Sequence, residues 1–561
     1  MVVALKNVVN NNMPLAISLK NLSLLMNKNL KNWGLSLVLV SMFSACMKDP
    51  LRNIKNISGV SWKGDYAAPL VNAELNLEDA VALVNPDWVN SFSNKTIVIH
   101  YDKKHFSKKG EELYALYDRY FNGDIVPTSS ELNILNTSGT VSVVRNLVFD
   151  MAPGAGLQFD SVWLKDGVVT YGMAINTNHQ GNLTVEFPDF KSSGLPVSFL
   201  DNWSSGGSLS LSPSHKVAGI ESLDLTKGNQ GFNQIRVKVT WNLTKSGVVG
   251  NNEHLQFNLA MQGLKFRKLY GNLGQQGLLN VQDSIDLTLF SNNILKGNII
   301  FEDSRIKLHF NNGTGLKSQY QVQQLYLVSK NGTPVAVTSY NAAGNVAAAP
   351  DNSSETRIAD SLYITKASGS NVAAVIRAEP PTLAYNVGIA PVMGRGYIWD
   401  NSTFDLTVSV ELPMLVSTKD LVLEDTSDLD LGIGKEGDYV EMIKFKANAE
   451  NGIPLGAGVQ CYFMDATNKV LDSLFQPFRY ILKQADVDAS GNVISTSKDQ
   501  WELVLERPRI SNILKATRLR TRAWIPTSSF NGNPVPVRIT TDQKLKFKLG
   551  AEIKLSADAE F

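Results

Sequence analysis

The sequence predicts a mainly β protein, built from several antiparallel β-sandwich or β-roll modules with a few short helices. From Thr137 onward, short runs rich in Val, Ile, Leu and Phe recur along the chain, and many of them alternate apolar and polar residues. Clusters of Gly, Asn, Asp and Ser separate these runs. Such spacing is typical of antiparallel strands that each bury one face.

Length and charge narrow the class further. The chain has 561 residues, of which 43% are hydrophobic and 19% are charged, with a net charge of +1. A chain of this size is long enough for two to four domains, each with its own core. The nearly neutral balance argues against a nucleic-acid partner, which requires a basic face.

The region 62–150 is predicted to combine helix and strand. The run Thr96–Tyr101 is short and β-branched, which favours a strand. The segment Lys108–Phe121 repeats its apolar residues at helical spacing and predicts the clearest helix of the chain.

Two β modules are predicted next, over residues 151–341 and 355–561. Residues 342–354 (AAGNVAAAPDNSS) are small and polar, which predicts a loop or a linker between the modules. The final strand, Leu545–Leu555, alternates apolar with mostly charged residues and should be half-buried. The other apolar runs predict strands in this order: 140–149, 167–175, 183–187, 235–243, 254–261, 285–290, 298–301, 305–310, 361–365, 403–412, 439–447, 458–464, 501–505, 517–525 and 535–539.

A loose internal repeat links residues 303–335 with residues 441–470. Each segment has an alternating strand, a break rich in Asn and Gly, a second strand ending in aromatic residues, and a hairpin turn. Two copies indicate a duplicated module and not a solenoid, which would require a tighter period repeated several times.

The stretch Met26–Pro50 predicts the cellular location of the protein. Two lysines precede an apolar run, Trp33–Phe43, which is too short for the ~20 residues of a membrane-spanning helix. Ser44-Ala45-Cys46 follows. This order resembles a bacterial lipoprotein signal, in which a peptidase cuts before the cysteine and the thiol receives a diacylglyceryl group. The resemblance implies that residues 1–45 form the signal region, with its true start at Met26, and that Cys46 is the lipidation site.

The chain after Cys46 resembles a known group as well. Trp62 is followed by A-x-P-L-V-N at residues 67–72 and then by a Leu-Glu-Asp helix start. This is similar to the mature N-terminus of large uncharacterised Bacteroidota outer-membrane lipoproteins, a resemblance that implies no known activity. Residues 46–61 would then form a lipid-anchored tether. Lys48 and Asp49, which follow closely after Cys46, resemble an export signal that favours display on the cell surface over the periplasmic face.

The only cysteine besides Cys46 is Cys461, which lies in a strand-like run. With Cys46 acylated it has no partner in the chain, so we expect no disulfide framework. Buried apolar packing is the expected role of Cys461, because the local sequence lacks the histidine that a nucleophile would require.

Four Asp-Ser pairs are each followed by an aliphatic residue, and their serines are Ser161, Ser284, Ser361 and Ser473. The pattern resembles an O-glycosylation sequon of exported Bacteroidota proteins, with the hydroxyl as acceptor. The alternative is structural, since Asp-Ser is a common turn pair whose side chains bond the local backbone before a strand.

Two tryptophans lie in polar, loop-like settings and are the candidates for stacking on sugar rings. They are Trp203 and Trp399, whereas Trp241 and Trp501 lie in alternating strands and are expected in the core. Core packing remains the alternative for all four.

No motif of catalysis or metal binding is complete. The six histidines include no H-E-x-x-H pair, and the chain has no nucleophile elbow, phosphate loop or C-x-x-C. Asp486–Gly491 begins like a calcium loop, but Ser497 stands where a carboxylate is required, which favours a hairpin turn. The acidic run Glu424–Asp430 is expected to be a solvated turn. We therefore expect no enzyme, no cofactor and no bound metal.

These observations predict a non-catalytic lipoprotein, anchored in the outer membrane by Cys46, that acts as a binding or scaffold component of the cell envelope with a protein partner. Two alternatives stay open. One is a surface glycan-binding lipoprotein of a nutrient-uptake system, and the other is a lipid-binding or lipid-transfer β-roll.

Overall fold

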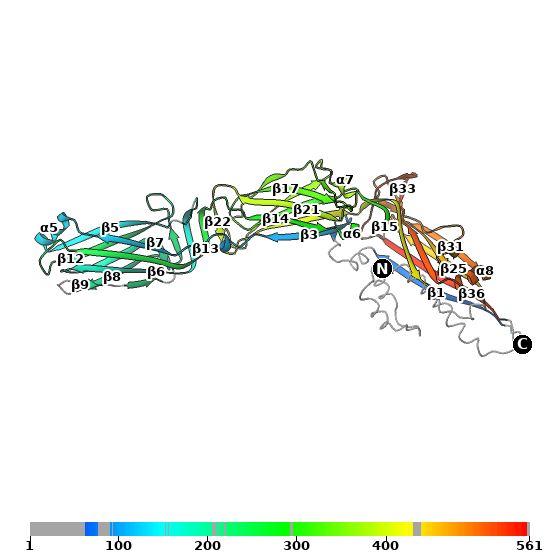
Figure 1. The fold of residues 1–561 in the computed structure, drawn as a ribbon, viewed down its shortest axis with the longest axis horizontal. Helices are drawn as coiled ribbons and strands as arrows, with labels where there is room; N and C mark the ends of the chain where they lie inside the picture. The colour runs from blue at the N-terminus through cyan, green and yellow to red at the C-terminus, as the bar shows by residue number, and fades with distance from the viewer. Residues whose placement is uncertain are drawn as a thin grey trace.

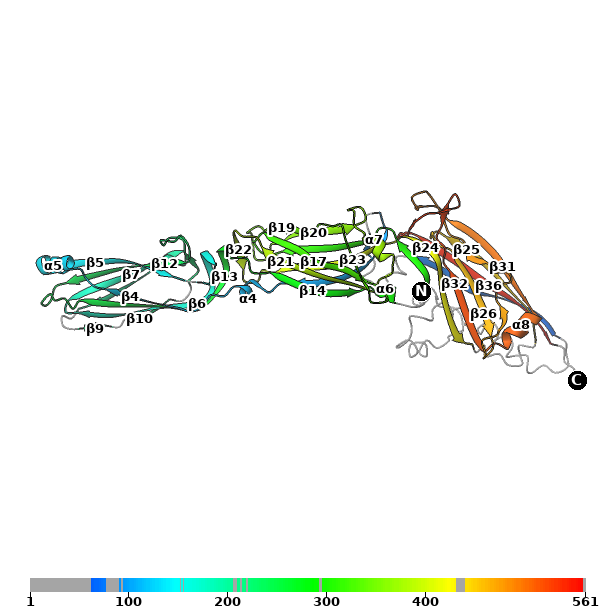
Figure 2. The same cartoon turned by 45° about the horizontal axis from the view of Figure 1, so that its top comes forward.

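The computed structural model describes residues 62–76, 90–91 and 94–557, with gaps at 152, 155, 205–208, 212–213, 218–219, 292–294 and 430–438. The fold is mainly β with antiparallel sheets, as predicted. Three bodies lie in a row and give the molecule the shape of a rod (Figure 1), and the turned view keeps the same order (Figure 2). Each body has its own cluster of buried apolar side chains. We call them the inner, middle and outer bodies by their place in the chain and not in the rod. The outer body contains the first and last described strands, and the inner body contains β4–β13 (residues 119–272).

The inner body lies at the left of Figure 1 and holds one 11-stranded sheet together with helix α5 (Ser129–Ser138). The path through the sheet is β22-β13-β6-β11-β7-β12-β5, and four further strands pair along it. The strands are β4 (Arg119–Ile125), β5 (Thr140–Asp150), β6 (Gln158–Thr177), β7 (Gln180–Ser192), β8 (Leu195–Trp203), β9 (Leu209–Leu211), β10 (Ser214–Val217), β11 (Ser222–Asp224), β12 (Gln234–Thr244), β13 (His254–Asn272) and β22 (Arg395–Trp399).

The middle body is a sandwich of two five-stranded sheets. One sheet holds β2 (Asn90–Ser91), β3 (Ile97–Phe106), β23 (Phe404–Pro413), β16 (Arg305–Asn312) and β20 (Ile358–Thr365). The other holds β14 (Leu279–Asp286), β21 (Thr382–Pro391), β17 (Ser318–Val328), β18 (Pro334–Ala336) and β19 (Ala343–Val346). Its short helices are α4 (Gly110–Leu113), α6 (Thr288–Ser291) and α7 (Val372–Ile376).

The outer body lies at the right of Figure 1 and is a second sandwich. Its four-stranded sheet holds β1 (Trp62–Asn76), β36 (Lys544–Ala557), β25 (Val440–Asn451) and β31 (Ser497–Glu506). Its seven-stranded sheet holds β15 (Leu295–Phe301), β24 (Leu415–Asp428), β32 (Arg518–Trp524), β26 (Ala457–Met464), β27 (Val470–Ser473), β28 (Tyr480–Leu482) and β35 (Val537–Arg538). Helix α8 (Arg507–Leu514) and the hairpins β29 (Asp486–Val487)–β30 (Val493–Ser495) and β33 (Ser529–Phe530)–β34 (Asn533–Pro534) complete it.

The three bodies are nested in the chain. β1 belongs to the outer body, β3 to the middle body and β4–β13 to the inner body. The chain then returns through the middle body, adding β15 to the outer body and β22 to the inner body on the way, and ends in the outer body. The predicted boundaries at 62–150, 151–341 and 355–561 therefore do not coincide with the bodies, and residues 62–150 contribute to all three. Pairings such as Trp62 with Ala557 join distant segments, and local periodicity carries no information about them.

The middle and outer bodies share one topology. The order β3-β23-β16-β20 in the middle body matches β1-β36-β25-β31 in the outer body, and β14-β21-β17-β18 matches β24-β32-β26-β27. In addition β19 pairs with β17 as β28 pairs with β26, and α7 and α8 occupy equivalent connections. The repeat predicted from residues 303–335 and 441–470 is thus part of a duplicated sandwich.

One buried asparagine organises the same turn in both copies. Asn312 donates its side-chain amide to the carbonyls of Leu316 and Ala347, and its Oδ1 accepts from the amide of Thr314. Asn451 forms the same bonds in the outer body. Its side-chain amide donates to the carbonyls of Leu455 and Lys483, and its Oδ1 accepts from the amide of Ile453. Because each amide satisfies buried backbone groups on two segments, it closes the break between the paired strands.

The helix predicted over Lys108–Phe121 is wrong. Only α4 is helical there, and β4 pairs with β13 over seven residues. The apolar stripe fitted a helix, but the sheet offered these residues a ladder of hydrogen bonds and a buried face, and tertiary pairing outweighed the local pattern. None of the helices in the described part of the chain is long and apolar enough to cross a membrane.

The helix that does form, α5, has clear start and stop signals. Thr128 and Glu131 form a capping box, and Gly139 ends the helix in the left-handed conformation at φ +76°. Both carboxylate oxygens of Glu131 also accept hydrogen bonds from Arg145, at 2.9 and 2.8 Å. These bonds, chiefly those from Arg145, lower the pKa of Glu131 to about 2.

Glu131→Gln is expected to lower the stability of the α5 segment by about 1 kcal/mol at pH 7. The folded-state pKa lies below the ordinary value of 4.5, so the contribution is complete above pH 4.5 and is lost as the pH falls towards 2. Amide hydrogen exchange of residues 129–138 measures it, with the two proteins compared at pH 7 and pH 2. An equal difference at both pH values would contradict this prediction.

Two further expectations need correction. Residues 342–354 are not a linker between bodies, because β19 pairs with β17 and the amide of Ala349 bonds to the carbonyl of Thr314 inside the middle body. Small residues were needed there: a Cβ on Gly344 would lie 2.4 Å from the Tyr320 hydroxyl. The run 285–290, predicted as a strand, contains the end of β14 and most of α6.

Candidate functional site

The joint between the inner and middle bodies is made by β22. This strand lies next to β23 in the chain, yet it pairs with β13 of the inner sheet, with Lys268 opposite Trp399 and Tyr270 opposite Tyr397. On its other side β13 pairs with β6, which sets Trp163 opposite Lys268. Cross-strand partners share one face of a sheet, so an aromatic surface forms across three strands.

We call this surface the joint face and define it by Trp163, Lys268, Tyr270, Tyr397 and Trp399. The side chains of Trp163 and Tyr270 are each 37% exposed. Trp399 is half-buried, and Tyr397 is buried. Two rings are therefore open to solvent, and the two others lie on β22, which pairs with β13.

Lys268 connects three of the four rings. Its Nζ lies 4.6 Å from the ring centroid of Trp163, 5.3 Å from that of Tyr397 and 5.2 Å from that of Trp399. The same ammonium pairs with the carboxylate of Asp351. Each cation–π contact contributes about 0.5–2 kcal/mol depending on burial, so the lysine fixes both the rings and the joint.

Tyr397 connects this face to the middle body. Its hydroxyl donates to the carbonyl of Ala349 at 2.7 Å. Burial, together with the nearby charge of Asp351, raises the pKa of Tyr397 to about 12. The phenol therefore stays protonated and keeps this hydrogen bond at any physiological pH.

The charges around the joint face are paired within the protein. Lys165 contacts Glu111 at 2.6 Å and Asp400 at 2.7 Å. Arg395 contacts Asp160 at 2.6 Å. With Lys268 paired to Asp351 as well, these three cations have carboxylate partners, and the surface around the rings is close to neutral.

The structure separates the two tryptophans selected from the sequence. Trp399 belongs to the joint face. Trp203 is only 8% exposed, and its indole donates to the carbonyl of His179 at 2.8 Å. Its proposed stacking role is wrong, because β8 extends through residues that looked like a polar loop and turns the ring into the core.

Trp163 and Tyr270 were not selected from the sequence. A usable signal was present for Trp163: alternation along β6 sets Ser161, Trp163 and Lys165 on one face, opposite the buried Val162 and Leu164. Tyr270 had no comparable local signal, since its exposure depends on the register between β13 and β22.

All four candidate acceptor serines lie within strands and not in turns before them: Ser161 in β6, Ser284 in β14, Ser361 in β20 and Ser473 in β27. In the last three pairs the aspartate accepts a hydrogen bond from the serine amide at 2.7 Å. Ser284 is the exposed one, on a strand at the edge of its sheet, while the other three are half-buried. Their modification remains a prediction.

The structure describes one of the two cysteines. Cys46 lies outside the described residues. Cys461 is fully buried in the outer core, and burial raises the pKa of its thiol to about 12. A buried, protonated thiol is a poor nucleophile, which agrees with a packing role.

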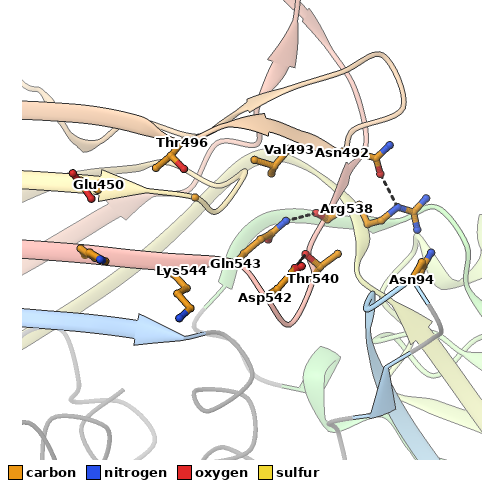
Figure 3. Close-up of a pocket in the computed structure, with 12 residues that line it drawn as sticks. Asn94, Glu450, Asn492, Val493, Thr496, Arg538, Thr540, Asp542, Gln543 and Lys544 are labelled. Carbon is orange, nitrogen blue, oxygen red and sulfur yellow. Dashed lines mark hydrogen bonds between the residues drawn. The ribbon is translucent and has the colours of Figure 1, made fainter.

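A polar pocket of about 520 Å³ lies where the middle and outer bodies meet (Figure 3). Arg538 donates from Nε to Asn492 and from Nη1 to Thr96 across this junction. Gln543 donates its amide to the carbonyl of Arg538 at 3.0 Å. The residues that line this pocket include no aromatic ring.

The predicted turn at Asp486–Gly491 is confirmed as a hairpin between β29 and β30. Asp488 closes it by accepting from the amides of Ser490 and Asn492 at 2.9 Å. The acidic run after Leu423 continues β24 instead of forming a turn, and Glu424 pairs with Arg522. Among the described residues, no group of three or more His, Cys, Asp or Glu side chains could hold a metal ion.

Comparison with known proteins identifies no family. No family model and no curated protein matches the chain. Among solved structures, a "putative secreted protein" of Parabacteroides distasonis is similar over 87% of this chain and 99% of its own, with 10% identity and a TM-score of 0.24. A tandem CBM22 domain of Paenibacillus barcinonensis Xyn10C covers 51% of this chain and 86% of its own (9% identity, TM-score 0.13), and a chain of Israel acute paralysis virus covers 27% and 75% (13% identity, TM-score 0.16). These scores establish no shared function.

Proposed function

We propose that this protein is a non-catalytic lipoprotein, anchored in the outer membrane through Cys46, that acts as a scaffold or binding component of the cell envelope. Its rod would hold the inner body away from the bilayer. The observation that supports this proposal is the direction of β1, the first described strand, relative to the axis of the rod.

β1 starts at one end of the rod. Trp62 pairs with Ala557, and Asn76 pairs with Lys544. The strand therefore runs from the free end of the outer body towards the middle body, while the inner body and α5 lie at the opposite end (Figure 1). About fifteen residues separate Cys46 from Trp62, a tether of at most ~50 Å. An anchor at Cys46 would attach to the end of the molecule that is farthest from the inner body.

Backbone hydrogen bonds across both joints support a rod that keeps its length. At the first joint β22, which precedes β23 of the middle body in the chain, extends the inner sheet. At the second, Thr96 forms a bridge with Thr540, and the amide of Ile97 bonds to the carbonyl of Ile539 at 3.1 Å. Backbone hydrogen bonds at both joints suit a spacer that carries the inner body.

The orientation can be tested on the purified native lipoprotein in vesicles that contain acceptor-labelled lipid. A donor dye is attached at Asp65→Cys, near the start of β1, or at Ser138→Cys, at the end of α5. Cys461 is buried with a raised pKa and Cys46 carries the lipid in this proposal, so labelling is confined to the new thiol. We expect strong energy transfer from position 65 and little from position 138.

Equal transfer from both positions would mean that the rod lies flat on the bilayer, and the display role would then be wrong. The same labelled proteins in detergent micelles without acceptor lipid provide the reference intensity for each position.

A further inference from the structure

We propose that the joint face binds an uncharged polysaccharide, with pyranose rings stacked on Trp163 and Tyr270. This goes beyond membrane display, since it assigns a ligand class to one surface of the protein. The inference starts from the two rings that are 37% exposed on adjacent strands of the same sheet.

The register places the two side chains on the same face of the sheet. Trp163 is opposite Lys268, and Tyr270 lies two residues further along β13 on the same face. Such diagonal neighbours are about 7–8 Å apart, within reach of large aromatic side chains. The rings can therefore contact successive parts of one extended ligand.

The support behind Trp163 holds this ring in place before any ligand binds. Lys268 contacts Trp163 and Trp399 and is itself held by Asp351. Because this network is formed before any ligand arrives, binding costs little side-chain entropy at Trp163.

The chemistry of the surface selects a sugar. A pyranose ring presents an apolar face of C–H groups, which are attracted to the negative face of an aromatic ring, and a rim of hydroxyls. Ser161 and Ser222 are the cross-strand neighbours of Tyr270 and Trp163, and they place hydroxyls beside the rings.

The charges around the rings indicate which class of polysaccharide the surface accepts. Lys268, Lys165 and Arg395 are each paired with carboxylates of the protein. An anionic ligand would have to compete with these partners, whereas an uncharged chain of sugars leaves every ion pair intact. The surface therefore fits a neutral polysaccharide better than an acidic one.

Affinity electrophoresis of the detergent-solubilised full-length protein tests the proposal. The probes are hydroxyethylcellulose, galactomannan and a soluble β-1,3-glucan, with polygalacturonic acid as the charged comparison. We expect at least one neutral probe to retard the protein, and we expect Trp163→Ala or Tyr270→Ala to weaken that binding about tenfold, as loss of a central aromatic contact does. Polygalacturonic acid should not retard it.

Tyr363→Ala is the matched control. Tyr363 is an exposed tyrosine of the middle body with a lysine, Lys307, against its ring, so its loss should leave retardation unchanged. Tyr270→Phe and Trp163→Phe keep a ring in place and should retain most of the binding, which separates stacking from damage to the fold.

The proposal is overturned if no neutral probe retards the protein, if only polygalacturonic acid does, or if Trp163→Ala and Tyr270→Ala bind as the native protein does. Because this assay uses protein in detergent, its result does not depend on which end of the rod faces the membrane. Failure of binding and failure of display are thus separate outcomes.

Discussion

Changing Cys46 to serine is expected to move the protein almost entirely from the membrane fraction to the aqueous fraction. In the proposed lipoprotein the diacylglyceryl group would be joined to the sulfur of Cys46, and a serine could not receive it. Each buried methylene of an acyl chain contributes about 0.8 kcal/mol, and stable anchoring takes more than one chain. Removal of the attachment point therefore removes the whole affinity for the bilayer.

Fractionation of cells followed by mass spectrometry of the N-terminal peptide measures this effect. The native protein should begin at Cys46 and carry acyl groups. Cys461→Ser is the matched control, because the buried Cys461 thiol packs in the outer core, and this variant should remain in the membrane. A serine variant that is processed and sediments with membranes as before would contradict the proposed lipid anchor and membrane location.

Ending the chain after Gln543, which removes β36, is expected to unfold the outer body while the inner body stays folded. β36 is the central strand between β1 and β25. It buries Leu549, Ile553 and Leu555, each worth about 2 kcal/mol, and its loss also breaks two ladders of hydrogen bonds. The sum approaches the whole stability of a typical domain, about 5–15 kcal/mol.

Amide hydrogen exchange followed by mass spectrometry locates the damage. We expect peptides of β1, β25 and β31 to lose protection, and peptides of β6, β7 and β12 to keep it. A chain that ends after Ala557 keeps β36 and serves as the control. If β1 stayed protected without β36, the nested arrangement would be wrong and a linear order of domains would be favoured.

Strands were predictable where alternation was long and regular. Leu545–Leu555 alternates in sequence, and β36 buries Leu549, Ile553 and Leu555 as expected. Helices were less predictable because their signals competed with tertiary pairing. Helix α5 was not predicted, and its capping box of Thr128 and Glu131 and its end at Gly139 became apparent only in the structure. The apolar stripe before it pointed to a helix, where the structure has β4 instead.

The candidate site was predictable only in part. Trp399 was selected for its polar surroundings and lies in the joint face, but the same reasoning selected Trp203, which is buried. A loop-like amino-acid composition does not show that a side chain is exposed to solvent. The solvent access of an aromatic ring depends on which strands pack beside it, and those strands come from elsewhere in the chain.

The sequence by itself determined the β class, the alternating faces of many strands and the duplicated module, because these depend on residues two apart in a strand or on a plan repeated along the chain. Only the tertiary structure decided the nesting of the three bodies, the burial of Trp203 and the meeting of Trp163, Tyr270 and Trp399. These depend on pairings such as Trp62 with Ala557, which are set by the free energy of closing whole sheets and leave no local pattern.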